Sequence, residues 1–311
     1  RGELIAMYDR SLEFDSEEFD RQTLDWEDVR LIRTANIVQV AFIDGTVAVG
    51  ELRLDGDAVL VIGADEHAST RAEILSITPG VHSRLDQWSA DIGAGFTARS
   101  GNTSQTEANA QVTVKRRRPR DRLGLDYLGN LSETDGVTTA DNQRASLSWD
   151  HFTSARFFVT PVSAEYYRDP FQNVSARWTL GSGVGYQLVD TAKVEWDVDV
   201  GLGYQRTTFD EVAAGEAEAE ETPAFFASTR YENEFRSWLD FFFDYQFFLV
   251  NEASGSYTHQ LWTGLEFDLV GDLDLEISWV WDRIQDPQPG ADGVLPRQDD
   301  YRTIFALEYS F

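Results

Sequence analysis

The sequence predicts an all-β protein: a transmembrane antiparallel β-barrel of about twelve strands, preceded by a small SH3-like or Sm-like β-domain. Three observations predict this fold. Alternating apolar and polar segments of 11–16 residues follow one another from Trp88 to Phe311, charges occupy the polar face of nearly every segment, and the connections alternate between short and long. A barrel that crosses a bilayer shows all three, because each strand has a lipid-facing and a lumen-facing side.

The composition bounds the class of protein. Hydrophobic residues make up 42% of the 311 residues and aromatic residues 13%, which is too apolar for a disordered chain despite a formal net charge of −28. We expect no nucleic-acid partner, because phosphate neutralisation needs Lys and Arg. The chain contains no cysteine, which excludes a disulfide framework and a thiolate metal site. No run of about 18 apolar residues occurs, so no transmembrane helix is expected.

The pattern changes near Thr78-Pro79-Gly80, which divides the chain into residues 1–80 and 81–311. The first part has short strands and tight turns, whereas the second has long alternating strands. We therefore expect a small β-domain followed by the barrel.

The first part contains a weak internal repeat. Gly2-Glu3-Leu4 recurs as Gly50-Glu51-Leu52, so the domain divides further into residues 1–35 and 37–80. Asp44-Gly45 predicts a hairpin with a type I′ turn, since both residues tolerate a positive φ.

The barrel segments are long and two-faced. They are residues 88–99, 104–116, 121–131, 142–153, 156–167, 174–188, 192–207, 223–233, 237–249, 257–269, 272–284 and 300–311. Strands of soluble sheets usually have 5–6 residues, whereas a tilted strand that crosses hydrocarbon needs about 10. A soluble sandwich would also alternate, but its core could not hold the charges of the second face.

The connections indicate the topology. The short ones are residues 118–120, 154–155, 190–191, 234–236 and 271, and the long ones are residues 132–141, 168–173, 210–222, 250–256 and 286–299. One connection on the long side, residues 100–103, is also short. Short periplasmic turns and long outer loops are typical of outer-membrane barrels. An even strand number places both barrel ends in the periplasm, so we expect residues 1–80 there and the barrel in a Gram-negative outer membrane.

Aromatic residues gather towards the strand ends, as expected of rings at a bilayer interface. They include Trp149, Trp178, Trp238, Tyr245, Tyr257, Trp281, Tyr301 and Tyr309. The last strand ends in an alternating series that is similar to the signal read by the barrel-assembly machinery, a predicted partner. That series is Phe305, Leu307, Tyr309 and Phe311.

Residues 88–311 resemble a bacterial family of salt-induced outer-membrane proteins. The resemblance is carried by Ile92-Gly93-Ala94-Gly95-Phe96-Thr97, Ser100-Gly101-Asn102-Thr103, the basic turn from Arg116 to Arg122, the run from Gly181 to Gln187 and the run from Val200 to Gln205. It covers most of the barrel and little of residues 1–80. The resemblance implies an outer-membrane barrel and no known activity, so no residue role is carried over.

Strand parity predicts the residues that line the lumen. The acidic ones are Asp91, Glu107, Asp126, Asp150, Glu165, Glu195, Asp197, Asp199, Asp240, Asp244, Glu266, Asp268, Asp274, Glu276 and Asp282, and the basic ones are Lys115, Arg122, Arg144, Arg177, Arg230 and Arg302. One reading is a narrow, water-filled, cation-preferring pore, since rings of carboxylates select cations. The other is a lumen closed by Arg–carboxylate networks. A barrel of about twelve strands is close to the size that side chains fill, so both stay open.

Two further patterns have alternative explanations. Gly181, Gly183, Gly185, Gly201 and Gly203 fall on the lumen face of two adjacent strands, and small residues there allow either close approach of another group or strand curvature. The acidic loop at residues 210–221 lacks the spacing of a calcium loop, so a solvated loop is favoured and no metal or cofactor is expected.

Enzymatic activity is not expected. An outer-membrane lipid hydrolase needs a Ser beside a His. The four histidines are His67, His82, His151 and His259. Only His259 falls on an outer half-strand that faces lipid, and its neighbouring outward positions contain no Ser.

Three functions remain at this point. The leading one is an outer-membrane channel, or a structural barrel with a periplasmic docking domain. The alternative is a non-conducting anchor or scaffold subunit of a cell-envelope complex, because a simple pore needs no domain at residues 1–80. The remote alternative is the lipid hydrolase. Expected partners are outer-membrane lipid and lipopolysaccharide, with a periplasmic protein bound through residues 1–80.

Overall fold

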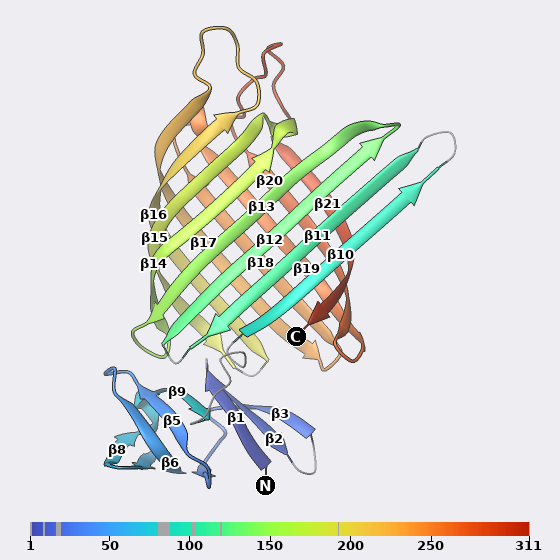
Figure 1. The fold of residues 1–311 in the computed structure, drawn as a ribbon. Coiled ribbons are helices and arrows are strands. Elements are labelled where there is room, and N and C mark those ends of the chain that lie inside the picture. The colour runs from blue at the N-terminus through green and yellow to red at the C-terminus, as the bar shows by residue number, and fades with distance from the viewer. Residues whose placement is uncertain are drawn as a thin grey trace.

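A computed structural model describes residues 2–8, 10–16, 20–79, 88–100, 104–118, 120–191 and 193–310. Figure 1 shows a small β-domain, in blue, beneath one end of a large barrel. The prediction of an all-β fold is confirmed, since the only helices in these ranges are three 3₁₀ turns of three residues each. None of the described helices is long and apolar enough to span a bilayer.

The N-terminal domain is one antiparallel sheet of nine strands. The elements are β1 (Gly2–Tyr8), β2 (Ser11–Ser16), β3 (Asp20–Asp25), β4 (Leu31–Arg33), β5 (Val38–Phe42), β6 (Val47–Asp55), β7 (Ala58–Ile62), β8 (Glu66–Thr70), η1 (Arg71–Glu73) and β9 (Ile74–Pro79). The strand order is β3-β2-β1-β9-β5-β6-β7-β8, and β4 pairs with β6. The last strand, β9, pairs with β1 on one side and with β5 on the other, so it connects the β1–β3 meander with the β5–β8 strands.

Strand β6 serves two halves of this sheet, and Gly50 lies where it changes partner. Val38 pairs with Gly50 on one side, and Glu51 pairs with Ile62 on the other. A Cβ at Gly50 would lie 2.3 Å from the carbonyl oxygen of Ile62, so only glycine permits this approach. The change of partner brings both halves of the sheet against one core.

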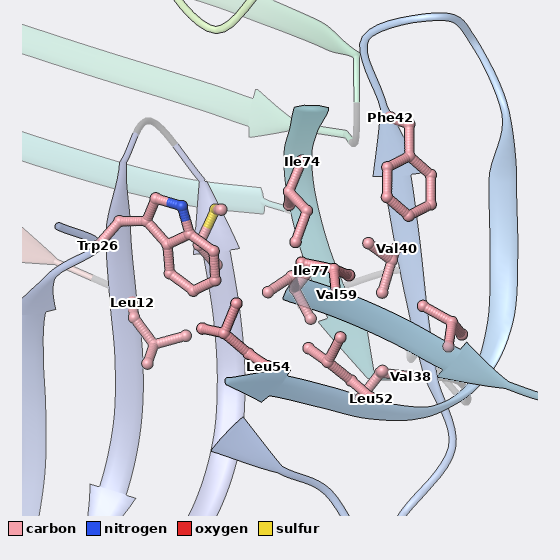
Figure 2. Close-up of a cluster of buried hydrophobic side chains, with 12 residues drawn as sticks. Leu12, Trp26, Val38, Val40, Phe42, Leu52, Leu54, Val59, Ile74 and Ile77 are labelled. Atoms are coloured by element: carbon pink, nitrogen blue, oxygen red, sulfur yellow. The ribbon is translucent and has the colours of Figure 1, made fainter. Parts of the chain in front are cut away.

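The core of this domain is apolar and fully enclosed (Figure 2). Its buried members are Met7, Leu12, Trp26, Val38, Val40, Phe42, Leu52, Leu54, Val59, Val61, Ile74 and Ile77. They come from both halves of the sheet, so burial of these side chains stabilises the domain as one unit.

The predicted hairpin exists, but its turn is not of type I′. Strands β5 and β6 pair from Val38 with Gly50 to Ala41 with Val47. Gly45 has φ +93°, whereas Asp44 is not among the residues with positive φ. A type I′ turn needs positive φ at both central residues. Here Asp44 instead accepts hydrogen bonds from Thr46 at 2.8 and 3.0 Å, which holds a longer loop.

Twelve strands close into a barrel, as predicted. They are β10 (Trp88–Arg99), β11 (Gln105–Arg117), β12 (Asp121–Thr134), β13 (Val137–Phe152), β14 (Phe157–Asp169), β15 (Val174–Asp190), β16 (Val194–Phe209), β17 (Ala219–Arg236), β18 (Leu239–Leu249), β19 (Tyr257–Val270), β20 (Leu273–Ile284) and β21 (Asp299–Ser310). Each pairs antiparallel with the next, and β10 pairs with β21. Every predicted segment corresponds to one strand.

The outward face of the barrel is apolar and uncovered. Phe96, Leu202 and Phe305 are 71%, 69% and 61% exposed, although each is a large hydrophobic side chain. A monomeric soluble protein does not expose such an extended apolar surface. The alternation arises because one face of each strand suits hydrocarbon and the other suits the interior.

The two ends of the barrel differ. At the domain end, which faces the N-terminal domain, the connections are short turns, and at the loop end most are longer (Figure 1). The prediction of a long loop at residues 132–141 was wrong. Strands β12 and β13 continue beyond the apolar band and meet in a two-residue turn at Asp135 and Gly136, whose φ values of +51° and +78° are those of a type I′ turn.

The N-terminal domain packs against the domain end. Its Ile43 and Leu75 form an apolar cluster with Phe152 and Phe158, the lowest inward residues of β13 and β14. The Arg117 guanidinium lies 5.4 Å from the ring of Tyr8 in β1 and 4.2 Å from the ring of Phe152. The domain therefore caps the barrel through apolar and cation–π contacts.

We predict that Leu54→Ala destabilises the N-terminal domain alone. Leu54 is fully buried, and truncating such a side chain costs about 2 to 5 kcal/mol. Hydrogen exchange of the full chain in lipid vesicles should show faster exchange in residues 20–79 and unchanged exchange in the barrel. Val47→Ala is the matched control, because Val47 is half exposed. Equal effects of the two variants would contradict the proposed core.

A second prediction concerns Glu73. Its carboxylate accepts hydrogen bonds from Ser69 Oγ at 2.7 Å, the Thr70 N–H at 2.8 Å and Thr70 Oγ1 at 2.9 Å. These bonds lower the pKa of Glu73 from its usual 4.5. A lowered folded-state pKa means stabilisation that is complete above pH 4.5 and lost as the pH falls below it.

The variant Glu73→Gln should therefore exchange amide hydrogens in β8 and β9 faster than the wild type at pH 7. The difference should shrink as the pH falls below 4.5, because both side chains are then uncharged. A difference that stays constant from pH 7 to pH 3 would show that the charge of Glu73 has no part in it.

Candidate functional site

The barrel interior holds the charged residues that strand parity placed on the lumen face. Towards the domain end, Arg122 of β12 forms ion pairs with Asp150 at 3.0 Å, Glu195 at 3.0 Å and Asp197 at 2.7 Å. Asp150 is on the adjacent strand β13, whereas Glu195 and Asp197 are on β16, so the last two bonds cross the lumen. The guanidinium also lies over the ring of Phe158, at 5.2 Å. One cation thus pairs with three carboxylates.

Two further cations pair within the same half of the barrel. Lys115 of β11 lies 3.2 Å from Glu232 of β17, which is again a bond across the lumen. Arg230 lies 3.4 Å from Asp244 and 4.0 Å from Asp126. The predicted residues of β11, β12, β17 and β18 are therefore brought together.

A second network occupies the loop end. Asp282 of β20 pairs with both Arg144 of β13, at 2.5 Å, and Arg302 of β21, which also donates to Asn142. The Arg144 guanidinium lies 5.0 Å from the ring of Tyr167. Arg144 of β13 reaches Asp282 of β20, and Arg302 of β21 reaches Asn142 of β13, so the network spans the lumen here.

Apolar side chains reinforce this closure. Tyr167, Val174 and Ile284 form one buried cluster near the loop end. A second cluster contains Leu128, Val280, Ile304 and Ala306, with Trp262 packed against it. Leu128 belongs to β12 and the others to β19, β20 and β21, so this cluster also crosses the interior.

Asn173 connects three loops at the loop end through its side-chain hydrogen bonds. It has φ +58°, and its side-chain nitrogen donates to the backbone oxygens of Glu211, Gln288 and Pro289 at 2.9 to 3.2 Å. Its side-chain oxygen accepts from the Glu211 N–H at 2.8 Å. One buried amide therefore connects the loops that follow β14, β16 and β20.

The opposite wall of the interior is acidic. We call the acidic wall the five carboxylates Asp91, Asp240, Glu266, Glu276 and Glu308, which lie on β10, β18, β19, β20 and β21. Among the described residues none of the five forms an ion pair. Gln111 Nε2 donates to Glu276 at 2.6 Å and to Glu308 at 2.8 Å. This wall therefore contributes negative charge that no side chain of the described chain balances.

A cavity of about 600 Å³ lies between this wall and the basic side chains. It is lined by all five carboxylates of the acidic wall, by basic residues that include Lys115, Arg122 and Arg230, and by Tyr8 and Glu13 of the N-terminal domain. A smaller cavity of about 110 Å³ adjoins it and is lined by Glu165, Asp199 and Phe226, among others. The larger space thus has its floor on the N-terminal domain.

The remaining predicted lumen residues have individual contacts. Asp199 accepts from Ser228, Glu165 accepts from Gln260 at 3.3 Å, Arg177 donates to Thr207 at 3.3 Å, and Asp274 accepts from Ser310 at 3.3 Å. Glu107 is half-buried on β11, and Asp268 is exposed at the end of β19, so Asp268 does not join the others.

Sequence reasoning missed the uncharged members of the interior. Gln111, Phe152, Phe158 and Tyr167 are buried and contact the charged networks. Their inward parity was readable, but only the charges were used as a signal. Of the assembly series, Phe305, Leu307 and Tyr309 share the exposed outward face of β21, while Phe311 lies outside the described residues.

The lumen-facing glycines receive aromatic rings. A Cβ at Gly201 would lie 2.1 Å from the ring of Phe226, and one at Gly185 would lie 2.1 Å from the ring of Phe158. Gly203 instead approaches the carbonyl oxygen of Leu180, at 2.5 Å. Close approach therefore accounts for Gly185 and Gly201, and the approaching groups are the barrel's own side chains.

His259 lies among aromatic residues on the outer face. Its Nδ1 is 2.7 Å from Tyr245 Oη, and its ring stacks on Trp281 at 5.6 Å. These contacts suit a residue at the membrane interface. His82 lies outside the described residues.

Residues 92–311 match the family described as "Protein of unknown function, DUF481". No curated protein matches the chain.

Solved outer-membrane proteins share the barrel architecture at low similarity. The translocator domain of the autotransporter NalP from Neisseria meningitidis is 11% identical, over 71% of this chain and 87% of that one, with a TM-score of 0.37. The channel DcaP of Acinetobacter baumannii is 13% identical, over 96% and 89%, with a TM-score of 0.34. The COG4313 channel from Pseudomonas putida F1 is 11% identical, over 72% and 94%, with a TM-score of 0.38. TM-scores this low carry no information about function.

We predict that Arg122→Ala strongly destabilises the barrel. It leaves Asp150, Glu195 and Asp197 without their cation in a mostly buried site, and breaking a buried ion pair costs about 3 to 5 kcal/mol. Urea unfolding of the full chain in lipid vesicles measures this change.

The control is Arg206→Ala, which removes an exposed ion pair with Glu221. That change should cost less than about 1 kcal/mol. If both variants unfold at the same urea concentration, the Arg122 network does not stabilise the barrel.

Proposed function

The chain belongs to the DUF481 family, and we propose that it is a non-conducting outer-membrane barrel that anchors its N-terminal β-domain at the periplasmic face. The observation that carries this proposal is the closure of the loop end. There Asp282, Arg144 and Arg302 bridge opposite sides of the barrel, and Tyr167 packs beside them. A lumen blocked in this way offers no aqueous path, while the barrel still holds a domain at the membrane surface.

The outward face supports a location in the membrane. It is apolar along every strand, with aromatic side chains such as Trp178, Trp238 and Tyr301 exposed towards the strand ends. Lipid tails, phospholipid headgroups and lipopolysaccharide are the partners of such a surface. The barrel-assembly machinery would insert the chain through the alternating face of β21.

The N-terminal domain supports a docking role. It is fixed to the barrel through Ile43 and Leu75, so a protein bound to it would be held at the membrane. Val47 and Val49 of β6 are both 50% exposed, and β3 and β8 are edge strands of the sheet. Exposed apolar side chains and free strand edges are features by which periplasmic proteins pair. We therefore favour a periplasmic protein as the partner.

The second candidate is a cation-preferring pore. It is favoured by the cavity of about 600 Å³ and by the unpaired carboxylates of the acidic wall. Rings of carboxylates select cations. This function would require the loop-end network to open.

Planar-bilayer recording separates the two candidates. We predict no steady conductance from the folded wild-type chain, because the loop end is closed. The triple variant Arg144→Ala, Arg302→Ala and Tyr167→Ala should produce channels that prefer K⁺ to Cl⁻, because it removes the closure and keeps Asp282. Arg206→Ala, at the exposed surface, should behave as the wild type.

Steady wild-type channels would establish the passive pore and remove the anchor proposal. A silent triple variant that is folded would show that the closure extends beyond the loop-end network.

A further inference from the structure

The seam of the barrel, where β10 meets β21, is paired over an unusually short length. Residue pairs run only from Asp91 with Ser310 to Ala94 with Leu307, which makes four pairs. Each of the other eleven strand pairs of the barrel has between nine and fifteen. The seam is therefore the part of the wall that the fewest backbone hydrogen bonds hold closed.

Above these pairs β10 and β21 no longer pair residue by residue. A Cβ at Gly95 would lie 2.2 Å from the carbonyl oxygen of Phe305, so the strands approach closely there without continuing their register. From Phe96 to Arg99 the side chains of β10 are exposed on both faces. Figure 1 shows the β10–β11 hairpin leaning away from the barrel at this level. No further pairing within the described residues supports the short paired stretch.

The larger cavity lies directly behind the paired stretch. Ser89 and Asp91 of β10 and Glu308 of β21 line it, and Asp91 and Glu308 are two residues apart in the seam register. Four residue pairs thus separate a space of about 600 Å³ from the outer surface of the barrel. Opening them would connect the cavity with the surrounding lipid.

Among the described residues, no basic side chain that lines the cavity forms an ion pair with the acidic wall. Lys115, Arg122, Lys193 and Arg230 pair with other carboxylates, whereas Arg116 and Arg117 lie against aromatic rings. The acidic wall forms no ion pair among the described residues. Carboxylates removed from water need a cation or hydrogen-bond donors.

A buried acceptor at the same place points to a donor that enters the cavity. Gln111 lines the cavity and is only 3% exposed. Its side-chain nitrogen donates hydrogen bonds to Glu276 and Glu308. Its Oε1 has no hydrogen-bond partner in the described structure. A primary ammonium group would supply both the charge and the three N–H donors.

A cation also lies beside the seam, at the edge of the cavity. Arg116 neighbours the seam in β11, pairs in register with Trp88, and its guanidinium lies 5.1 Å from the Trp88 ring. Trp88 is exposed at the domain end, where an aromatic ring suits the headgroup level. Arginine binds phosphate well because its planar donors match the phosphate oxygens.

We propose that the β10–β21 seam is a lateral portal through which the ammonium group of a zwitterionic phospholipid enters the cavity. The ammonium binds the acidic wall at Asp91 and Glu308, the phosphate binds Arg116, and the acyl chains stay against the outer surface beside Ile92. A soluble cation carries no phosphate for Arg116 to bind and does not need to enter from the lipid through the short seam. The proposal rests on the membrane location proposed above, and it holds whether or not the lumen conducts.

Lipid selectivity tests the proposal. The full chain is reconstituted in phosphatidylglycerol vesicles that contain equal amounts of phosphatidylethanolamine and phosphatidylcholine, then extracted in mild detergent, and the retained lipids are counted by native mass spectrometry. We expect phosphatidylethanolamine over phosphatidylcholine by about tenfold, because a quaternary ammonium cannot donate the charge-assisted hydrogen bonds. Equal retention of the two lipids would overturn the proposal.

A reversible lock tests the route. Ala94→Cys with Leu307→Cys places two thiols at an opposed, outward pair of the seam, and the chain has no native cysteine. Oxidation should reduce retained phosphatidylethanolamine to the phosphatidylcholine level, and reduction should restore it. The matched control is Leu125→Cys with Leu147→Cys, an outward pair within the long β12–β13 ladder, which should have no effect.

A third arm separates the lipid from a soluble source of the same ammonium group. The double variant Asp91→Asn with Glu308→Gln should abolish the preference for phosphatidylethanolamine while the seam is not locked by a disulfide. Spermidine is added to the locked protein and its binding is measured by calorimetry. Retention that persists in the locked protein, or spermidine binding without any lipid preference, would overturn the lateral route and assign the cavity to soluble cations from the domain end.

Discussion

The requirement that every backbone N–H and C=O within hydrocarbon be hydrogen-bonded controls this structure. Lipid tails accept and donate no hydrogen bonds, so strands that cross a bilayer must close into a ring. Twelve strands satisfy this demand through eleven long ladders and one short one, between β10 and β21. The ring then fixes which side chains face each other across the lumen. The ion pairs and cavities follow from that closure.

Charge is distributed unevenly around the closed interior. Lys115, Arg122 and Arg144 pair with carboxylates of distant strands, and these bonds cross the lumen. Near the seam, Asp91 and Glu308 have no such partner among the described residues. A buried polar network in which every group has a partner makes the interior rigid. Buried carboxylates without a cation are unfavourable, so they attract a positively charged group. We therefore propose that the same barrel combines a closed loop end with a cavity that binds a cationic group.

Most of the fold was readable because the membrane imposes a strong pattern. Each predicted segment became one strand, since lipid on one side and a polar interior on the other force a period of two. The prediction failed at residues 132–141, because these residues of β12 and β13 are mostly polar. The segment therefore shows no alternation of apolar and polar residues by which the strands could be predicted. The pattern also gave the wrong turn at Asp44, whose side chain binds Thr46 instead of allowing a positive φ.

Local patterns in the sequence are enough to predict the all-β class, the twelve strands, the outward apolar face and the inward parity of the charged residues. These properties are local, because each depends only on residues one or two positions apart. Only the tertiary structure decided that Arg122 meets Glu195, that Arg302 meets Asp282, and that β10 meets β21 over four pairs. Such partners depend on the curvature and register of a closed ring, to which every strand contributes and which no single segment of sequence encodes.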